Sequence, residues 1–518
     1  MTDLPIVAHG DVTLDARERE RLRHLARDLC ADEPALSAAG AFGLWVSPGL
    51  GPWPSLVIED HSWIALFEGR GDAAYAYRAL LLAGEGDLAV IAPPRCRGFE
   101  DYCRSVLELG HVEILTPAAS AKPLALAQRC ADDADLVGRA VDVARRSGGL
   151  NVVPYMGTGG VWALARRIAE VARVPVRVAA PIPRLTRRVN DKTWFAARVG
   201  EVLGAQAAPP SKAVYNLAAL AGQAAALARQ YRSVAIKVPD SASSAGNIIL
   251  DSRYIRDVAL RHLRDTAASS LRGVGWQGAF PLMVTAWEEP ILASPSAQTW
   301  IPDRREGLPV VEGLFDQLVS GPAREFAGAA PSALPEPWRH RLAQEAVRLA
   351  YVFQELGYFG RCSFDAIIAG EDLAAAGLHW VECNGRWGGV SIPMTLANRL
   401  VGDWTRRPPV IIDRANLTGA PRNFDDILAE LDADLFKPGV RDTGAVIISP
   451  SRLQDGSGYE VMVLGKTIAA AQAQAEDLAA RLAPSQAGSA TSPEEGLRNP
   501  LADRHVRGRW VGSTIPPG

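Results

Sequence analysis

Short apolar runs alternate with helical stretches through the first third of the chain. Apolar runs at 88–94 and 111–117 predict two buried strands, and the segment 101–110 between them has the pattern of a helix. Residues 151–160 are predicted to form a loop, and a helix follows over 161–174. Strands that alternate with helices are typical of a parallel sheet, so we expect an α/β layer here.

The middle of the chain ends in a pair of neighbouring strands. The pattern predicts, in order, a helix over 214–231, a strand over 234–238, a small-residue loop over 239–247, a strand over 281–287 with a second strand after it, a polar and Pro-rich connection, and a helix over 337–357. The strands 361–369 and 379–384 follow, separated by a loop. Their spacing predicts an antiparallel hairpin.

A third pattern begins near residue 411. It contains strands over 444–450 and 459–465 and a helix over 468–483, which together indicate a small α+β unit. The C-terminal residues beyond it are poor in apolar side chains, so we expect a flexible tail there.

Composition narrows the class of protein. The 518 residues are 48% hydrophobic and 22% charged, which is the balance of a globular chain of about two to four domains. A net charge of −3 gives no basic field for nucleic acid, and no apolar run is long enough to span a bilayer. No signal peptide is visible. The six cysteines are scattered along the chain, which indicates reduced thiols rather than a disulfide framework or a metal site. We expect a cytoplasmic protein that binds neither nucleic acid nor membranes.

The segment ECNGRWGG, residues 382–389, carries the strongest chemical signal. Because side chains alternate along a strand, Glu382, Asn384 and Arg386 can share one face, while Val381 and Cys383 point inward. Two oxygen ligands and a guanidinium in a row suit a magnesium–triphosphate complex. Across the hairpin, Asp365 would face Glu382 at about 5 Å between Cβ atoms. The alternative is a surface strand with ordinary polar alternation.

Two lysines lie upstream of this segment. Lys237 ends a strand and precedes a loop rich in Ser and Gly, which includes Ser244 and Gly246 and could fold over phosphates. Lys192, in the segment VNDKTWF, is a second candidate for a phosphate contact. The alternative for Lys237 is a lysine that extends from a strand end into water.

Two further segments have candidate binding roles. Trp287, Glu288 and Glu289 follow a strand and could form an inter-domain hinge where exposed backbone groups bind adenine, although an acidic turn is the alternative. The arginines of the segment PRLTRRV, Arg184, Arg187 and Arg188, could hold a substrate carboxylate or belong to the solvated surface.

The order of these features resembles the ATP-grasp superfamily over about residues 145–405. Within it, the segments ECNGRWGGVSIP, TAWEEPILASPS and VVPYMGTGG are most similar to the pheganomycin-type peptide ligases. The resemblance implies an α/β and α+β multidomain fold: an N-terminal pre-ATP-grasp α/β domain (1–145), an ATP-grasp domain (146–408) with a lid at about 205–285, a small C-terminal α+β domain (409–484) and a flexible tail (485–518).

The resemblance also implies ATP and Mg²⁺ as cofactors, with Mn²⁺ able to replace Mg²⁺. It assigns these roles: Lys192 and Lys237 to the phosphates, Ser244 and Gly246 to the loop over them, Trp287, Glu288 and Glu289 to adenine, Asp365, Glu382 and Asn384 to the metal, and Arg386 to phosphate, with Arg386 and Lys237 as catalytic residues. Many members hold the ribose with a glutamate a few residues after the hinge. This chain has Ser296-Ala297-Gln298 there, so Gln298 could substitute but the ribose contact is open.

The function implied is an ATP- and Mg²⁺-dependent ligase that joins a carboxylic acid to the amine of an amino acid or peptide through an acylphosphate, in peptide natural product biosynthesis. The alternatives are a small-molecule kinase that uses the same nucleotide site and a catalytically silent ATP-binding module. Intact Asp365, Glu382, Asn384 and Arg386 disfavour the silent module. A homodimer is expected by analogy of fold alone.

Overall fold

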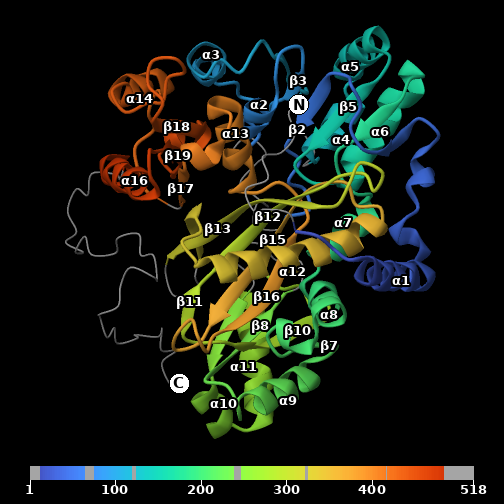
Figure 1. Ribbon diagram of the computed structural model, residues 1–518, viewed down its shortest axis with the longest axis vertical. Helices are drawn as coiled ribbons and strands as arrows, with labels where there is room; N and C mark the ends of the chain where they lie inside the picture. The colour runs from blue at the N-terminus through green and yellow to red at the C-terminus, as the bar shows by residue number, and fades with distance from the viewer. Residues whose placement is uncertain are drawn as a thin grey trace.

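The computed structural model describes residues 12–64, 75–118, 124–238, 247–320, 325–415 and 417–482. Their strands form three sheets, of six, four and nine strands (Figure 1). Within these ranges, no helix is both long enough and apolar enough to cross a membrane. The expected tail at 485–518, and the loop residues Ser244 and Gly246, lie outside the described residues.

The six-stranded sheet is parallel throughout, in the order β1-β6-β5-β2-β3-β4. Its strands are β1 (Val46–Pro48), β2 (Ser55–Ile58), β3 (Leu88–Val90), β4 (Glu113–Leu115), β5 (Leu150–Pro154) and β6 (Val176–Val178). The helices around it are α1 (Ala16–Asp32), α2 (Arg78–Leu82), α3 (Arg97–Asp101), a π-helical turn (Tyr102–Val106), α4 (Leu126–Asp132), α5 (Ala134–Ser147) and α6 (Gly159–Ala172). The predicted parallel α/β layer is confirmed.

One prediction about this sheet is wrong. Residues 151–154 were expected in a loop but form β5, next to β2 in the centre of the sheet. Asn151 is a residue type that is common in turns, but here its side chain is buried in the strand. Its Oδ1 accepts a hydrogen bond from the Gly51 N–H at 2.7 Å, and its Nδ2 donates to the Gly51 carbonyl at 2.9 Å. The domain boundary at residue 145 therefore cuts through the sheet, which continues to β6.

The four-stranded sheet is antiparallel, in the order β7-β10-β8-β9. It consists of β7 (Ser211–Val214), β8 (Ser233–Lys237), β9 (Asn247–Asp251) and β10 (Leu282–Trp287), with helices α9 (Leu217–Leu227), α10 (Ser252–Asp257) and α11 (Leu260–Gly273) on it. Its buried side chains, such as Leu220, Ile236 and Leu263, form a cluster of their own. This unit coincides with the segment predicted as a lid, and a separate core would let it move as one body.

The nine-stranded sheet holds the hairpin predicted at 361–384. Its strands are β11 (Ile291–Ala293), β12 (Pro295–Ile301), β13 (Val310–Ser320), β14 (Glu325–Pro331), β15 (Gly360–Ala369), β16 (Gly377–Asn384), β17 (Pro409–Arg414), β18 (Gly444–Ser449) and β19 (Tyr459–Leu464). β13 and β14 replace the polar, Pro-rich connection that the sequence suggested. Polar side chains are buried in β13, and Asp316 there accepts a hydrogen bond from Ser332 Oγ at 2.9 Å.

The remaining helices are α7 (Pro183–Asn190), α8 (Lys192–Leu203), α12 (Glu336–Glu355), α13 (Ser391–Val401), α14 (Phe424–Leu431), α15 (Ser451–Asp455) and α16 (Ile468–Leu482). The C-terminal α+β unit does not build a sheet of its own. Its strand β17 pairs with β14, and β19 and β18 follow, so they extend the central sheet at one edge (Figure 1). The strands before and after residue 408 therefore belong to one sheet.

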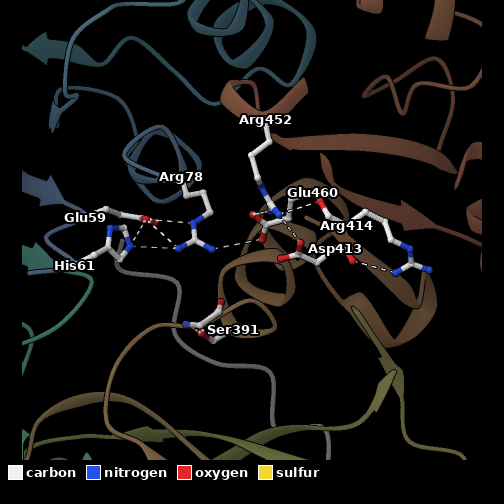
Figure 2. Close-up of polar contacts among 9 residues, drawn as sticks. Glu59, His61, Arg78, Ser391, Asp413, Arg414, Arg452 and Glu460 are labelled. Atoms are coloured by element: carbon white, nitrogen blue, oxygen red, sulfur yellow. Dashed lines mark hydrogen bonds and ion pairs between the residues drawn. The ribbon is translucent and has the colours of Figure 1, made fainter. Parts of the chain in front are cut away.

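Buried charges join the N-terminal sheet to the C-terminal strands (Figure 2). Arg78 of α2 contacts Glu59 at the end of β2 at 3.1 Å and Glu460 of β19 at 3.5 Å. Arg452 then lies 3.6 Å from Glu460 and 2.6 Å from Asp413. Removing such charges from water is costly, so each depends on its partners to stay ionised. The network fixes how the first and last parts of the chain sit against each other.

Candidate active site

The hairpin β15–β16 brings the predicted oxygen ligands together. Asp365 pairs directly with Glu382, and Ser363 pairs with Asn384, which confirms the predicted position of Asp365 across from Glu382. A bulge follows, because Ala366 pairs with Trp380 and leaves Val381 as an extra residue. Cys383 is buried as expected, but Val381 is only half-buried because the bulge turns it away from the core.

Asp365 lies at the centre of a polar network. Its carboxylate accepts hydrogen bonds from Ser296 Oγ at 2.6 Å and from Asn384 Nδ2 at 2.9 Å. Burial, together with the nearby Glu382 carboxylate, raises the pKa of Asp365 to about 7. Gln298 is buried and donates to Ser296 Oγ at 2.8 Å. Gln298 thus supports the carboxylates, and its contact with ribose stays a prediction.

Lys192 is the cation nearest to Glu382. It is the first residue of α8 and is buried, with its Nζ 3.2 Å from Glu382 Oε2. Burial alone would raise the pKa of Glu382, but the charges of Lys192 and Lys237 outweigh it and lower that pKa below its ordinary value. Glu382 therefore stays ionised beside a carboxyl group, Asp365, whose pKa is raised.

Lys237 reaches the same place from the four-stranded sheet. It is the last residue of β8, and its Nζ lies 6.0 Å from the centroid of the Trp287 ring. Burial lowers the pKa of Lys237 to about 8, an effect that Glu382 opposes and Lys192 reinforces. The two predicted phosphate lysines therefore act on one carboxylate, and Trp287 lies beside Lys237.

The hinge residues connect the two sheets. β10 ends at Trp287, and β11 begins at Ile291 and pairs with β15, so the chain passes from the small sheet to the central one here. The Glu288 carboxylate contacts Nδ1 of His379 on β16. Glu289 is half-buried in the same connection. The residues thus lie in the connection between the two sheets, and their roles as a hinge and as contacts of adenine stay predictions.

Arg386 is held by a residue that the sequence did not single out. Asn190, the last residue of α7, accepts hydrogen bonds from Arg386 Nη1 at 2.8 Å and from the Gly385 backbone N–H at 3.1 Å. A Cβ on Gly385 would lie 2.4 Å from Val189 Cγ2, so only glycine permits this approach. The segment Asn190-Asp191-Lys192 contained a signal, but only Lys192 was assigned a role from it.

A cavity of about 390 Å³ opens beside these residues. One wall is the end of the hairpin, a second is α7 with its arginines, and a third comes from the loops after β2 and β5. β2 and β5 are neighbours from which the chain leaves in opposite directions across the sheet, and ligands of open parallel sheets bind at the carboxyl ends of such strands. The cavity therefore adjoins both the charged cluster and a recurrent ligand position.

The residues fit a magnesium–nucleotide complex. Arg386 Nε is buried and has no hydrogen-bond partner among the described residues. Because buried donors normally have a partner, this N–H group is available to bind an anion. In the described parts of the chain, no group of three or more His, Cys, Asp or Glu could hold a metal ion. Mg²⁺ that binds with a nucleotide needs only one or two carboxylates, because waters and phosphates complete its shell. Asp365 and Glu382 are sufficient for that role.

Comparison with known proteins agrees with this architecture. Residues 76–170 match the family model described as the pre ATP-grasp domain. The structure is similar to that of N5-carboxyaminoimidazole ribonucleotide synthetase from Thermus thermophilus, with a TM-score of 0.50 and 14% identity over 84% of this chain and 99% of that chain. The chain has an ATP-grasp fold.

Biotin carboxylase from Campylobacter jejuni is also similar, with a TM-score of 0.47 and 12% identity over 85% of this chain and 91% of that chain. No curated protein matches the sequence. At these identities the similarity concerns the fold and does not identify a substrate.

Proposed function

We propose that this chain is an ATP- and Mg²⁺-dependent ligase that joins a carboxylic acid to an amine. The observation that carries the proposal is the cluster at the hairpin end, where Asp365, Glu382 and Asn384 stand beside three cations. Asp365, Glu382 and Asn384 would hold Mg²⁺, which neutralises phosphate oxygens and orients a triphosphate. Mn²⁺ could replace it, since both ions accept oxygen ligands.

The cations of the cluster account for phosphate binding. Lys192 and Lys237 place two ammonium groups near Glu382, and Arg386 presents an unpartnered Nε. Together they would stabilise the negative charge that spreads over a phosphoryl group during its transfer. Trp287, Glu288 and Glu289 at the hinge, with Gln298 behind Ser296, are the proposed surroundings of the adenosine.

The reaction proposed has two steps. A substrate carboxylate oxygen attacks the γ-phosphorus of ATP, ADP leaves, and an acylphosphate forms. The amine nitrogen attacks the acyl carbon, inorganic phosphate leaves with the electron pair of the broken C–O bond, and the nitrogen loses a proton to give the amide. No protein nucleophile is required, so the residues act by positioning and by neutralising charge.

The amine substrate proposed is an amino acid or a peptide. The resemblance of ECNGRWGGVSIP and TAWEEPILASPS to pheganomycin-type peptide ligases supports this class and a role in peptide natural product biosynthesis. A cavity of about 390 Å³ can enclose a small molecule of that size. A homodimer remains part of the proposal by analogy of fold.

The test is a product assay with Mg-ATP over a panel of carboxylic acids, amino acids and short peptides. The wild-type protein is run beside Glu382→Gln and beside Glu371→Gln, which changes an exposed carboxylate in the loop of the same hairpin. We expect amine-dependent release of ADP and phosphate with a new amide mass, lost in Glu382→Gln and retained in Glu371→Gln.

Three results would contradict the proposal. ADP accompanied by a phosphorylated product and no free phosphate would make the protein a kinase. Failure to bind ATP would remove the nucleotide site altogether. Equal turnover by Glu382→Gln and the wild-type protein would separate the activity from the hairpin cluster.

A further inference from the structure

Three arginines of α7 line the cavity beside the hairpin. Arg187 and Arg188 lie three and four residues after Arg184, so each is a neighbour of Arg184 on the helix surface, and all three line the cavity. In all, five lining side chains are Lys or Arg and two are Asp or Glu. Cations thus outnumber carboxylates among the lining residues, which favours a negatively charged ligand.

Two of the three arginines already have a carboxylate. Glu33 contacts Arg184 through one oxygen and Arg188 Nε through the other, the second at 2.8 Å. The ion pairs found among the described residues give Arg187 no such partner. Arg187 is thus the arginine of α7 whose charge is not neutralised by the protein in that part of the structure.

Arg187 is nevertheless held in place. Its guanidinium carbon lies 4.3 Å from the centroid of the Trp63 ring, and Trp63 is half-buried in the loop after β2. A guanidinium that stacks on an indole keeps its N–H groups at the rim, where they can bind a carboxylate through two hydrogen bonds. The contact with the Trp63 ring therefore orients the Arg187 guanidinium, and both side chains line the cavity.

The other charges of the cavity have different roles. Lys192 pairs with Glu382, and Asp191 caps α8 by accepting from the backbone N–H groups of Thr193 and Trp194. Arg386 is bound by Asn190 at the hairpin end, where the phosphates are proposed. The Arg187 end is left for a negative group on the substrate that takes no part in phosphoryl transfer.

We propose that Arg187, stacked on Trp63, binds a carboxylate of the substrate that does not react. This inference rests on the proposed ligase function and names the substrate class of that site. The free α-carboxylate of an amino acid or peptide acceptor has this chemistry, and so does the second carboxylate of a dicarboxylic acid donor. Arg187 and Trp63 select substrates that carry this second carboxylate. The reacting carboxylate and the amine nitrogen remain at the hairpin cluster.

The experiment compares substrates with and without that carboxylate. ADP release is measured for amino acid and dipeptide acceptors and for their C-terminal amides, and separately for dicarboxylic acids and their half-amides. The variants are Arg187→Gln, Arg187→Lys and Trp63→Leu, and the matched control is Arg167→Gln, an exposed arginine of α6 that does not line the cavity.

We expect Arg187→Gln to raise KM about 10- to 100-fold for the free carboxylate while kcat changes less than about threefold, because a charge-assisted pair is lost only in binding. The amide should have the same high KM with wild-type protein and variant. Arg187→Lys should recover part of the loss. Sensitivity to acceptor amidation assigns the carboxylate to the acceptor, and sensitivity to half-amidation assigns it to the donor.

An unchanged KM in Arg187→Gln, or an equal increase for acid and amide, would overturn the inference. If the wild-type protein releases no ADP with any pair, the ligase proposal fails, and the site is judged by calorimetry with dipeptides and dicarboxylates in the presence of ADP and Mg²⁺. Weaker binding of free carboxylates to Arg187→Gln supports the site. Equal binding to both proteins, or binding to neither, rejects it.

Discussion

Replacing Arg78 by leucine tests whether the buried charges at the domain junction hold the chain together. Glu59 and Glu460 are both 1% exposed, and Arg78 is the side chain that contacts them both, at 3.1 and 3.5 Å (Figure 2). Its guanidinium also lies over the rings of Tyr75 and Tyr155, at 4.9 and 5.3 Å. Leucine fills part of the volume but provides no charge and no donor.

The expected cost follows from burial. Removing one partner of a buried ion pair lowers the free energy of unfolding by about 3–5 kcal/mol, because a carboxylate is left in a low-dielectric site. With an unfolding entropy of about 2.1 cal/mol/K per residue, cooperative unfolding of the whole chain would turn that loss into a fall in Tm of roughly 3–5 °C. His61 at 3.1 Å from Glu59 and Arg452 at 3.6 Å from Glu460 limit the loss, so we expect the lower half of the range.

The pH dependence of the variant has a defined sign. Burial already raises the pKa of Glu460 in the folded protein, and loss of Arg78 should raise it further. A carboxyl group whose folded pKa exceeds its unfolded pKa favours the folded state below the unfolded pKa, and that contribution is lost as pH rises through the folded pKa. The difference in Tm between wild-type protein and Arg78→Leu should therefore be larger at pH 8 than at pH 5.5.

The assay is thermal unfolding followed by far-ultraviolet circular dichroism at both pH values. Arg139→Leu serves as the control, since Arg139 forms a two-point ion pair with Glu113 on the surface, at 2.9 Å for each contact. Exposed pairs contribute little to stability, so its Tm should stay near that of the wild-type protein. The reasoning is refuted if Arg78→Leu is no less stable than Arg139→Leu, or if its deficit grows as pH falls.

Three further predictions concern the hairpin cluster. Asn190→Ala should lower kcat/KM for ADP release about 10- to 100-fold, because Arg386 loses a charge-assisted hydrogen bond, and an unchanged rate would remove Asn190 from the site. Gly385→Ala should lower the rate of ADP release more than about tenfold, because the added methyl group clashes with Val189. Adding Val189→Ala should restore part of that rate. A normal rate in Gly385→Ala would refute the close approach of Gly385 to Val189. The apparent affinity for Mg²⁺ with ADP should rise from pH 6 to pH 8, because the pKa of Asp365 is raised to about 7 and the metal needs the ionised form, and calorimetry of Asp365→Asn should show a flatter profile.

The sequence predicted the hairpin and its register because the signal there is local. Strands 361–369 and 379–384 are close in sequence and pair as a hairpin, and the bulge at Val381 then brings Asp365 opposite Glu382, where an unbroken register would place it opposite Val381. In the four-stranded unit, β8 and β10 were predictable from clear apolar runs, but β7 and β9 were not predicted.

The missed features depend on contacts between distant parts of the chain. Asn190 and Arg386 are 196 residues apart in sequence, so no local pattern indicates that one orients the other. β13 carries Glu312 and Asp316, which look like surface residues, yet Glu312 pairs with Arg361 and Asp316 with Ser332 inside the protein. Strands on either side of residues 145 and 408 pair in one sheet, and pairing between such distant segments is visible only in the fold.

The fate of a carboxylate oxygen tests the central claim most directly. With an acid and amine that support turnover, the acid is labelled with ¹⁸O in its carboxylate, and the inorganic phosphate released with Mg-ATP is analysed by mass spectrometry. An acylphosphate route transfers one labelled oxygen to each phosphate, because the C–O bond to that oxygen breaks when the amide forms. Release of singly labelled phosphate by the wild-type protein, and none by Glu382→Gln, is the predicted result. Unlabelled phosphate, or amide formed without phosphate release, would contradict it.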